Sequence, residues 1–218
     1  GNGQLSKFQF RSLRDMLRGA KSTGKKTQAI VAGTGLGKSY GFQLGVLISL
    51  VHARAVRDDY VARTVHSIIL YPRVALVLDQ RQGIIRLLDK VNEILEREGL
   101  RSLTHVTDAK SMLKQDEYAR WFPNASLRDL EEMSIKTAIE HIYGNPQPPD
   151  VVIGNPDSLR NRMWHPDSAY ALQTDLRHVI YDEIHLLESI SGANGSAFLK
   201  RLSGISNPGF EIMLTGSD

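Results

Sequence analysis

A glycine-rich stretch, AGTGLGKSY at residues 32–40, combines residue types that bind phosphate. It follows the apolar run Gln28–Val31 and precedes a long helical pattern, so a strand should lead into it and a helix out of it. Backbone N–H groups at such a junction, backed by the positive end of the helix dipole, hold phosphate oxygens. Lys38 would reach the β- and γ-phosphates of a nucleotide, and the Ser39 hydroxyl would bind Mg²⁺. The expected nucleotide-binding residues are Gly33, Thr34, Gly35, Leu36, Gly37, Lys38, Ser39 and Tyr40.

A second group of reactive side chains, DEIH at residues 182–185, directly follows the apolar run His178–Tyr181. If this run is a strand next to the glycine-rich strand in a parallel sheet, Asp182 lies where Mg²⁺ needs a carboxylate. Glu183 would then orient and deprotonate the attacking water. Alone, an acidic pair after a strand is as typical of a solvated loop as of a functional site. Downstream of a phosphate cradle, and with His185 two residues further on, it predicts a Walker B site.

Length and composition restrict the protein class. A chain of 218 residues is long enough for one large domain and short for two, so we expect a single domain over residues 1–218. The net charge of +3 is compatible with a polyanionic partner without requiring one. The absence of cysteine excludes disulfides, thiolate zinc sites and cysteine-ligated iron–sulfur clusters. No apolar run approaches bilayer length, so we expect no membrane partner and a cytoplasmic protein.

The elements that must position these residues follow from the apolar patterning. Five short, near-continuous apolar runs are typical of strands buried on both faces of a parallel sheet; they cover residues 27–32, 66–71, 150–153, 177–181 and 210–214. Helical patterns separate them, most clearly around residues 84–95. The expected fold is α/β, an open, mostly parallel sheet with helices on both faces. Residues 100–149 are polar and turn-rich, which favours a partly helical insertion.

Taken together, AGTGLGKS and DEIH resemble motifs I and II of the superfamily 2 helicases, the DEAD/DEAH-box group, whose motif I reads A-x-T-G-x-G-K-[ST]. Further stretches follow in the family's order. YPRVALVLDQ at 71–80 resembles motif Ia, and LTGSD at 214–218 occupies the place of motif III without its Ser-Ala-Thr letters. GNPDSL at 154–159 resembles the TNPDML form of motif Ib, found in a bacterial and fungal branch that also carries a Gly-x-x-Gly-Ser segment after motif II, here GANGS at 192–196.

The resemblance implies a RecA-like P-loop domain that uses ATP and Mg²⁺, with four catalytic residues: Lys38, Asp182, Glu183 and His185. Ser39 and Asp182 would hold the metal. Gln9, in a segment similar to the family's adenine-reading segment, would contact the base, although FQFRSLRDM fits an amphipathic helix with one exposed Gln equally well. The residues implied for nucleic-acid contact are Pro72, Arg73, Asn155, Pro156 and Asp157, and those for coupling are Thr215, Gly216 and Ser217.

The implied function is that of the first motor domain of an ATP-dependent helicase acting on DNA or RNA, with DNA favoured. Family members carry a second RecA-like domain that supplies arginine fingers, so we expect the 218 residues alone to be nearly inactive. Two alternatives stay open: a double-strand DNA translocase that does not separate strands, and a P-loop ATPase unrelated to nucleic acid. Trp164, which follows a helical segment, is expected to pack at the helix end rather than to stack on a base.

Overall fold

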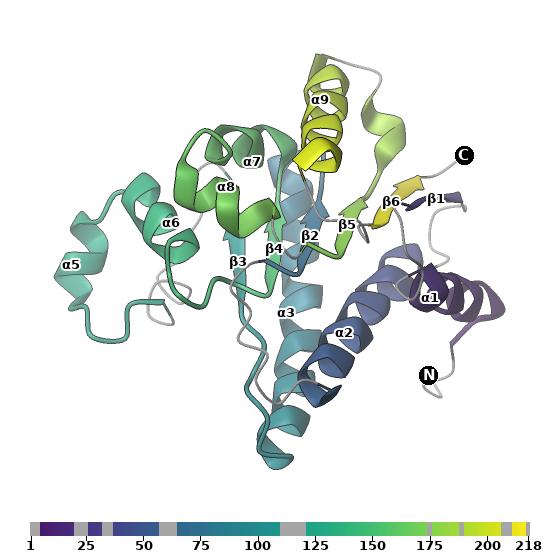
Figure 1. Cartoon of the computed structure of the whole chain (residues 1–218), viewed down its shortest axis with the longest axis horizontal. Coiled ribbons are helices and arrows are strands. Elements are labelled where there is room, and N and C mark those ends of the chain that lie inside the picture. Colours follow the sequence, from purple (N-terminus) through teal and green to yellow (C-terminus); the bar gives the residue numbers. More distant parts are fainter. Residues whose placement is uncertain are drawn as a thin grey trace.

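A six-stranded parallel sheet forms the centre of the computed structural model, which describes residues 5–19, 26–31, 37–56, 65–109, 121–173, 176–187, 190–205 and 211–216 (Figure 1). The strands are β1 (Lys26–Val31), β2 (Ser67–Leu70), β3 (His105–Asp108), β4 (Val151–Gly154), β5 (His178–Tyr181) and β6 (Glu211–Gly216). Their order in the sheet is β1-β6-β5-β2-β4-β3, and every neighbouring pair is parallel.

Helices connect the strands. They are α1 (Lys7–Gly19), α2 (Lys38–Val56), α3 (Val74–Arg97), α5 (Leu127–Glu132), α6 (Ile135–Tyr143), α7 (Pro156–Arg162), α8 (Pro166–Gln173) and α9 (Ile190–Ile205), with a short 3₁₀ turn, η1 (Ile184–Leu187). No helix among these described residues is long and apolar enough to cross a membrane.

Two apolar cores lie on opposite faces of the sheet. On one face, Ile69 and Ile180 pack with α2 and α3 through side chains such as Phe42 and Leu88. On the other face, Ile68 and Val179 pack with residues of α6, α7, α8 and α9. Neighbouring strand residues therefore point to different cores, as in any sheet covered on both sides. This arrangement confirms the predicted α/β fold with helices on both faces.

Two details of the predicted sheet are wrong. All five expected strands form, but β3 was missed, because its buried polar residues Thr107 and Asp108 break the apolar pattern. The region 100–149, expected to be an insertion, thus contributes a sheet strand as well as the core helix α6. In addition, β5 does not lie next to β1: β6 lies between them and pairs with both. The position of β6 between β1 and β5 depends on where the crossover connections place each strand, and a single sequence does not indicate this.

Buried polar groups tie the helices to the amino-terminal edge of the sheet. Arg54, near the end of α2, contacts Asp150 at 2.5 Å, and both side chains are almost fully buried. The Asp150 carboxylate also accepts hydrogen bonds from the backbone N–H and the hydroxyl of Thr104, at 2.8 and 3.2 Å. Because Asp150 precedes β4 and Thr104 precedes β3, this one carboxylate joins α2 to two strands.

His66, at the start of β2, is buried in the same region. Its Nδ1 lies 2.8 Å from the Ser67 hydroxyl, and its ring centroid lies 5.5 Å from that of His178. Burial lowers the pKa of His66 well below 6.5, and electrostatic repulsion from His178, Arg177 and Arg54 lowers it further. The native protein therefore holds His66 neutral.

We expect the free energy of unfolding to fall as the pH drops below about 6.5. The unfolded chain binds a proton at His66 in that range while the native chain does not, so this residue contributes a slope of up to about 1.4 kcal/mol per pH unit. Urea unfolding at pH 7.5 and 5.5 measures it. His66→Asn should flatten the dependence, whereas the same change at exposed His52 should leave it intact. Equal slopes for His66→Asn and the parent protein would contradict the assignment.

Candidate nucleotide site

The nucleotide site is built around the start of α2. Gly37, the residue before the helix, has φ 70°, and a Cβ at this position would lie only 2.4 Å from Nε2 of Gln9. The backbone conformation therefore favours glycine, and a Cβ here would also displace the Gln9 amide. The cradle residues 33–36 lie outside the described part of the chain. Tyr40, in the first turn of α2, is 43% exposed and available for contact with a ligand.

Lys38 is held at this site by the neighbouring strand. Its ammonium group is buried and donates a hydrogen bond from Nζ to the backbone oxygen of Gly216 at 2.7 Å. Gly216 belongs to β6, the strand that lies between β1 and β5. The Lys38 charge is thus already positioned next to Gly37, at the start of α2. A phosphate oxygen that reached this ammonium group would replace the neutral Gly216 carbonyl as its acceptor, and the hydrogen bond to a charged acceptor is stronger.

Asp182, at the carboxyl end of β5, is the centre of the second half of the site. Its side chain is buried, and Oδ2 accepts a hydrogen bond from the Ser39 hydroxyl at 3.2 Å. Oδ1 accepts from the Thr215 hydroxyl and, at 2.9 Å, from the backbone N–H of Glu183. Three segments far apart in the sequence, α2, β5 and β6, therefore meet at one carboxylate.

The donor set at this point fits Mg²⁺. Ser39 and Asp182 supply a hydroxyl and a carboxylate oxygen, which are hard ligands of the type this ion prefers. Among the described residues there is no cluster of three or more His, Cys, Asp or Glu side chains. A site with few protein ligands suits Mg²⁺, because this ion keeps several waters and binds substrate phosphates directly.

Glu183 and His185 form a pair beside this carboxylate. Glu183 has φ 55°, the only positive φ of a non-glycine residue in the described ranges. Such backbone strain is found most often at functional sites. Nδ1 of His185 lies 3.2 Å from Oε2 of Glu183, and both side chains are partly exposed, His185 at 37% and Glu183 at 29%. The Glu183 carboxylate is therefore oriented by a neighbour and accessible to water.

Gln9 approaches the cradle from α1. Its Nε2 donates to the backbone oxygen of Gly37 at 3.3 Å, while its Oε1 accepts from the backbone N–H of Ser6 at 2.9 Å. The Ser6 hydroxyl in turn accepts from the N–H of Gln9, which makes a reciprocal cap at the start of α1. The structure thus brings Gln9 to the nucleotide site, and its amide also has a structural role that the sequence analysis did not consider.

Tyr71 is a further neighbour of the site that the sequence did not predict. This residue directly follows β2 and is fully buried. Burial raises the pKa of the Tyr71 phenol well above its usual range, and the charge of Asp182 raises it further, so the hydroxyl stays protonated beside that carboxylate. The available signal was the position of Tyr71 immediately before Pro72, in the loop expected to contact nucleic acid. Tyr71 is thus next to that loop in the sequence and close enough to Asp182 to feel its charge.

The residues expected to contact nucleic acid have different environments. Arg73 is exposed and directly precedes α3, without a side-chain hydrogen bond to the start of the helix. Asn155 is 7% exposed: its Oδ1 accepts from the N–H groups of Asp157 and Ser158, and its Nδ2 donates to the oxygen of Pro72 at 3.2 Å. Pro156 is buried and Asp157 half-buried. Asn155 therefore joins the two expected nucleic-acid loops, and Arg73 is the exposed cation among these residues.

Two further expectations concern the ends of this region. Among the residues expected to couple the site to a partner domain, Thr215 and Gly216 contact Asp182 and Lys38, while Ser217 lies outside the described residues. The expectation that Trp164 packs at a helix end is wrong, because the indole is 73% exposed. The Arg201 side chain lies over its ring instead of an apolar core, with Cζ 4.7 Å from the ring centroid.

Gly195, in the GANGS segment of α9, permits close packing against the Walker B strand. A Cβ here would lie 2.8 Å from the Tyr181 hydroxyl and 3.2 Å from its ring, and Tyr181 is fully buried. We expect Gly195→Ala to destabilise the protein by about 1–3 kcal/mol through overpacking. Gly204→Ala on the same helix meets nothing within 4 Å and should be neutral or stabilising by up to about 1 kcal/mol. Urea unfolding of both variants tests the difference in sign.

Comparison with known proteins identifies the family of this chain. A family model described as DEAD/DEAH box helicase matches residues 6–215. None of the curated proteins matches the sequence. Among solved structures, the DUF1998 helicase MrfA is similar, with a TM-score of 0.60 and 20% identity over 100% of this chain. The Mycobacterium smegmatis helicase Lhr bound to ssDNA and AMP-PNP has a TM-score of 0.59 and 20% identity over 97% of this chain. Mss116p bound to ssRNA and AMP-PNP has a TM-score of 0.60 and 16% identity over 97%.

These structures are much longer than the present chain. It spans 27% of MrfA, 25% of Lhr and 38% of Mss116p. At such identities the likeness concerns the fold, which is the RecA-like domain of these proteins.

Proposed function

Because this chain belongs to the DEAD/DEAH box helicase family, we propose that it is the first of two RecA-like motor domains in an ATP-dependent helicase that moves along nucleic acid, with DNA as the favoured track. The observation that carries the proposal is the convergence of three distant segments, with Lys38 and Ser39 from α2, Asp182 after β5 and Gly216 from β6, beside the strained and partly exposed Glu183. A cytoplasmic site of action is part of this proposal.

In this mechanism each residue has a defined task. Lys38 binds the phosphates of ATP, and Ser39 and Asp182 would hold Mg²⁺, which would supply positive charge to the transferred phosphoryl group. Glu183 orients the attacking water and accepts its proton, and His185 holds the Glu183 carboxylate in place. Gln9 recognises the adenine. Arg73 pairs with a phosphate of the nucleic acid, and Asn155, Pro156 and Asp157 position the adjoining loop.

Hydrolysis and movement would be linked through β6. Thr215 binds Asp182 and Gly216 binds Lys38, so both nucleotide-binding residues contact the same strand. We propose that β6, together with Ser217 that follows it, transmits changes in the bound nucleotide to the second domain.

The GNPDSL and GANGS segments further support a place in the branch with a TNPDML-like motif Ib.

The test uses the full-length protein and the 218-residue chain side by side. Full-length protein should hydrolyse ATP faster when single-stranded DNA or RNA is added, while the isolated chain should hydrolyse it hardly at all, because arginine fingers contributed by a partner domain are worth about 10³–10⁵ in rate. Strand displacement measured beside triplex displacement distinguishes unwinding from translocation alone. ATP turnover by the full-length protein that ignores added nucleic acid would contradict the proposal and favour a P-loop ATPase of another kind.

A further inference from the structure

An exposed aromatic side chain lies at the turn between α7 and α8. Trp164 is 73% exposed, the highest value for a large apolar side chain in the described part of the chain. The turn itself is well defined, since the Trp164 N–H donates to the oxygen of Asn161 and the His165 N–H donates to the oxygen of Arg162. A rigid turn thus presents to water a residue type that is usually mostly buried.

Arg201 of α9 stacks on this indole. Its Cζ lies 4.7 Å from the ring centroid, and its Nη2 donates to the backbone oxygen of Met163 at 3.5 Å. The guanidinium is therefore held against the indole by two contacts while its side chain stays exposed. An arginine and a tryptophan in this arrangement offer a flat aromatic surface and a fixed positive charge side by side.

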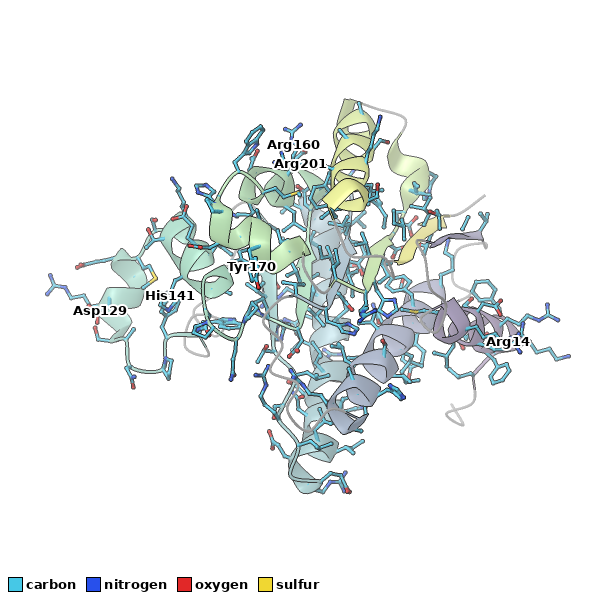
Figure 2. All side chains as sticks on the ribbon, viewed as in Figure 1. Arg14, Asp129, His141, Arg160, Tyr170 and Arg201 are labelled. Carbon is cyan, nitrogen blue, oxygen red and sulfur yellow. The ribbon has the colours of Figure 1, made fainter. Side chains whose placement is uncertain are left out.

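The two helices that carry this pair, α7 and α9, are basic on this side, whereas α8, which begins two residues after Trp164, has Asp167 in its first turn. The last turn of α7 carries Arg160 and Arg162, and α9 carries Lys200 and Arg201 without an acidic residue between 190 and 205. Arg162 is engaged with Asp108 at 3.1 Å. Figure 2 places Arg160 and Arg201 on the same side of the molecule, over the packed helices α7 and α9. The only acidic residue of these two helices, Asp157, lies in the first turn of α7, at the opposite end from Trp164.

This location is one short helix away from the expected nucleic-acid loop at Asn155. Asn155 caps the amino end of α7 and Trp164 follows its carboxyl end. Seven residues of helix span about 10 Å. A strand that passes the Asn155 loop therefore has to run only the length of α7 to meet the indole. Bases stack on exposed aromatic rings without regard to sequence, and arginine pairs with phosphate, so single-stranded nucleic acid matches both features of the site.

We propose that Trp164 and Arg201 form an accessory binding site for single-stranded nucleic acid, in which a base stacks on the indole and the guanidinium faces a phosphate. The inference rests on the proposed function, because it adds a contact to a strand already bound along the Arg73 and Asn155 edge. In this proposal the surface formed by α7 and α9 helps to bind the same nucleic-acid strand.

The experiment uses the intrinsic fluorescence of the chain, which contains two tryptophans. Trp121→Phe leaves Trp164 as the only fluorophore. This variant is titrated at low salt with a fluorescein-labelled sixteen-nucleotide strand, oligo(dT) or oligo(U), and both the anisotropy of the label and the tryptophan emission are recorded. We expect binding to quench Trp164. Trp164→Ala should weaken binding about tenfold, the range for loss of one stacked base, and Trp164→Phe should weaken it by much less.

The matched control is Tyr170→Ala on α8, because Tyr170 is also exposed, at 56%, but Figure 2 places it away from Arg160 and Arg201. Its affinity should equal that of the parent protein. If Trp121→Phe does not fold, the difference in emission between the parent chain and Trp164→Phe gives the same signal. A normal anisotropy rise without quenching, with Trp164→Ala binding as tightly as the parent, would overturn the accessory site and leave the proposed function intact. Absence of any anisotropy change would overturn the accessory site, and nucleic-acid stimulation of ATP turnover by the full-length protein would still decide the proposed function.

Discussion

Substituting Glu183 by Gln is expected to lower the nucleic-acid-stimulated ATP turnover of the full-length protein by about 10²–10⁴-fold, the usual contribution of a general base. The amide keeps the size of the side chain and can still contact His185, but it cannot accept a proton from water. ATP binding should survive, because the phosphate and metal contacts assigned to Lys38, Ser39 and Asp182 are unchanged. The variant should therefore hold ATP without consuming it.

The control for this prediction is Lys38→Ala, which removes the cation at the cradle and should lose ATP binding together with turnover. Steady-state hydrolysis and equilibrium binding of a fluorescent ATP analogue separate the two defects. If Glu183→Gln retained most of its turnover, another group would have to be the base. If it lost ATP binding as well, the role of Glu183 would be structural, through its unusual backbone conformation.

The largest effect on stability is expected for Arg54→Ala. This change leaves the Asp150 carboxylate, which is fully buried, without its closest cation. Breaking a buried ion pair from one side costs about 3–5 kcal/mol, because the remaining charge is not compensated. The weaker contact of Asp150 with Arg101, at 3.9 Å, replaces little of it. Urea unfolding followed by circular dichroism gives the change in the free energy of unfolding.

A second arginine variant sets the scale for this measurement. Arg128 pairs with Glu132 at 2.9 Å on α5, but both side chains are largely exposed. Arg128→Ala should therefore change stability by no more than about 0.5 kcal/mol. Similar losses for the two variants would mean that the Arg54–Asp150 pair is far better solvated than its burial indicates.

The sequence predicted the parts of the site that chemistry restricts to a few residue types. A glycine-rich turn before Lys38 and Ser39 and an acidic pair after an apolar strand are recognisable, because phosphate and Mg²⁺ accept few alternatives. The β3 strand was not recognisable, since its buried Asp108 is compensated by Arg162, which lies far along the chain. Nor was the environment of Trp164, whose ring contacts Arg201 from another helix instead of an apolar core. Pairings between distant elements leave no local pattern.

The position of β6 bears on how the molecule folds. The cradle strand β1 lies at one edge of the sheet and pairs only with β6, the last strand of the described chain. During folding, β1 therefore has no sheet partner until β6, about 180 residues further along, is available, and contacts between such distant segments form slowly. The nucleotide site should be among the last parts to assemble. ATP, which binds only the finished site, would then stabilise this edge of the sheet against detachment.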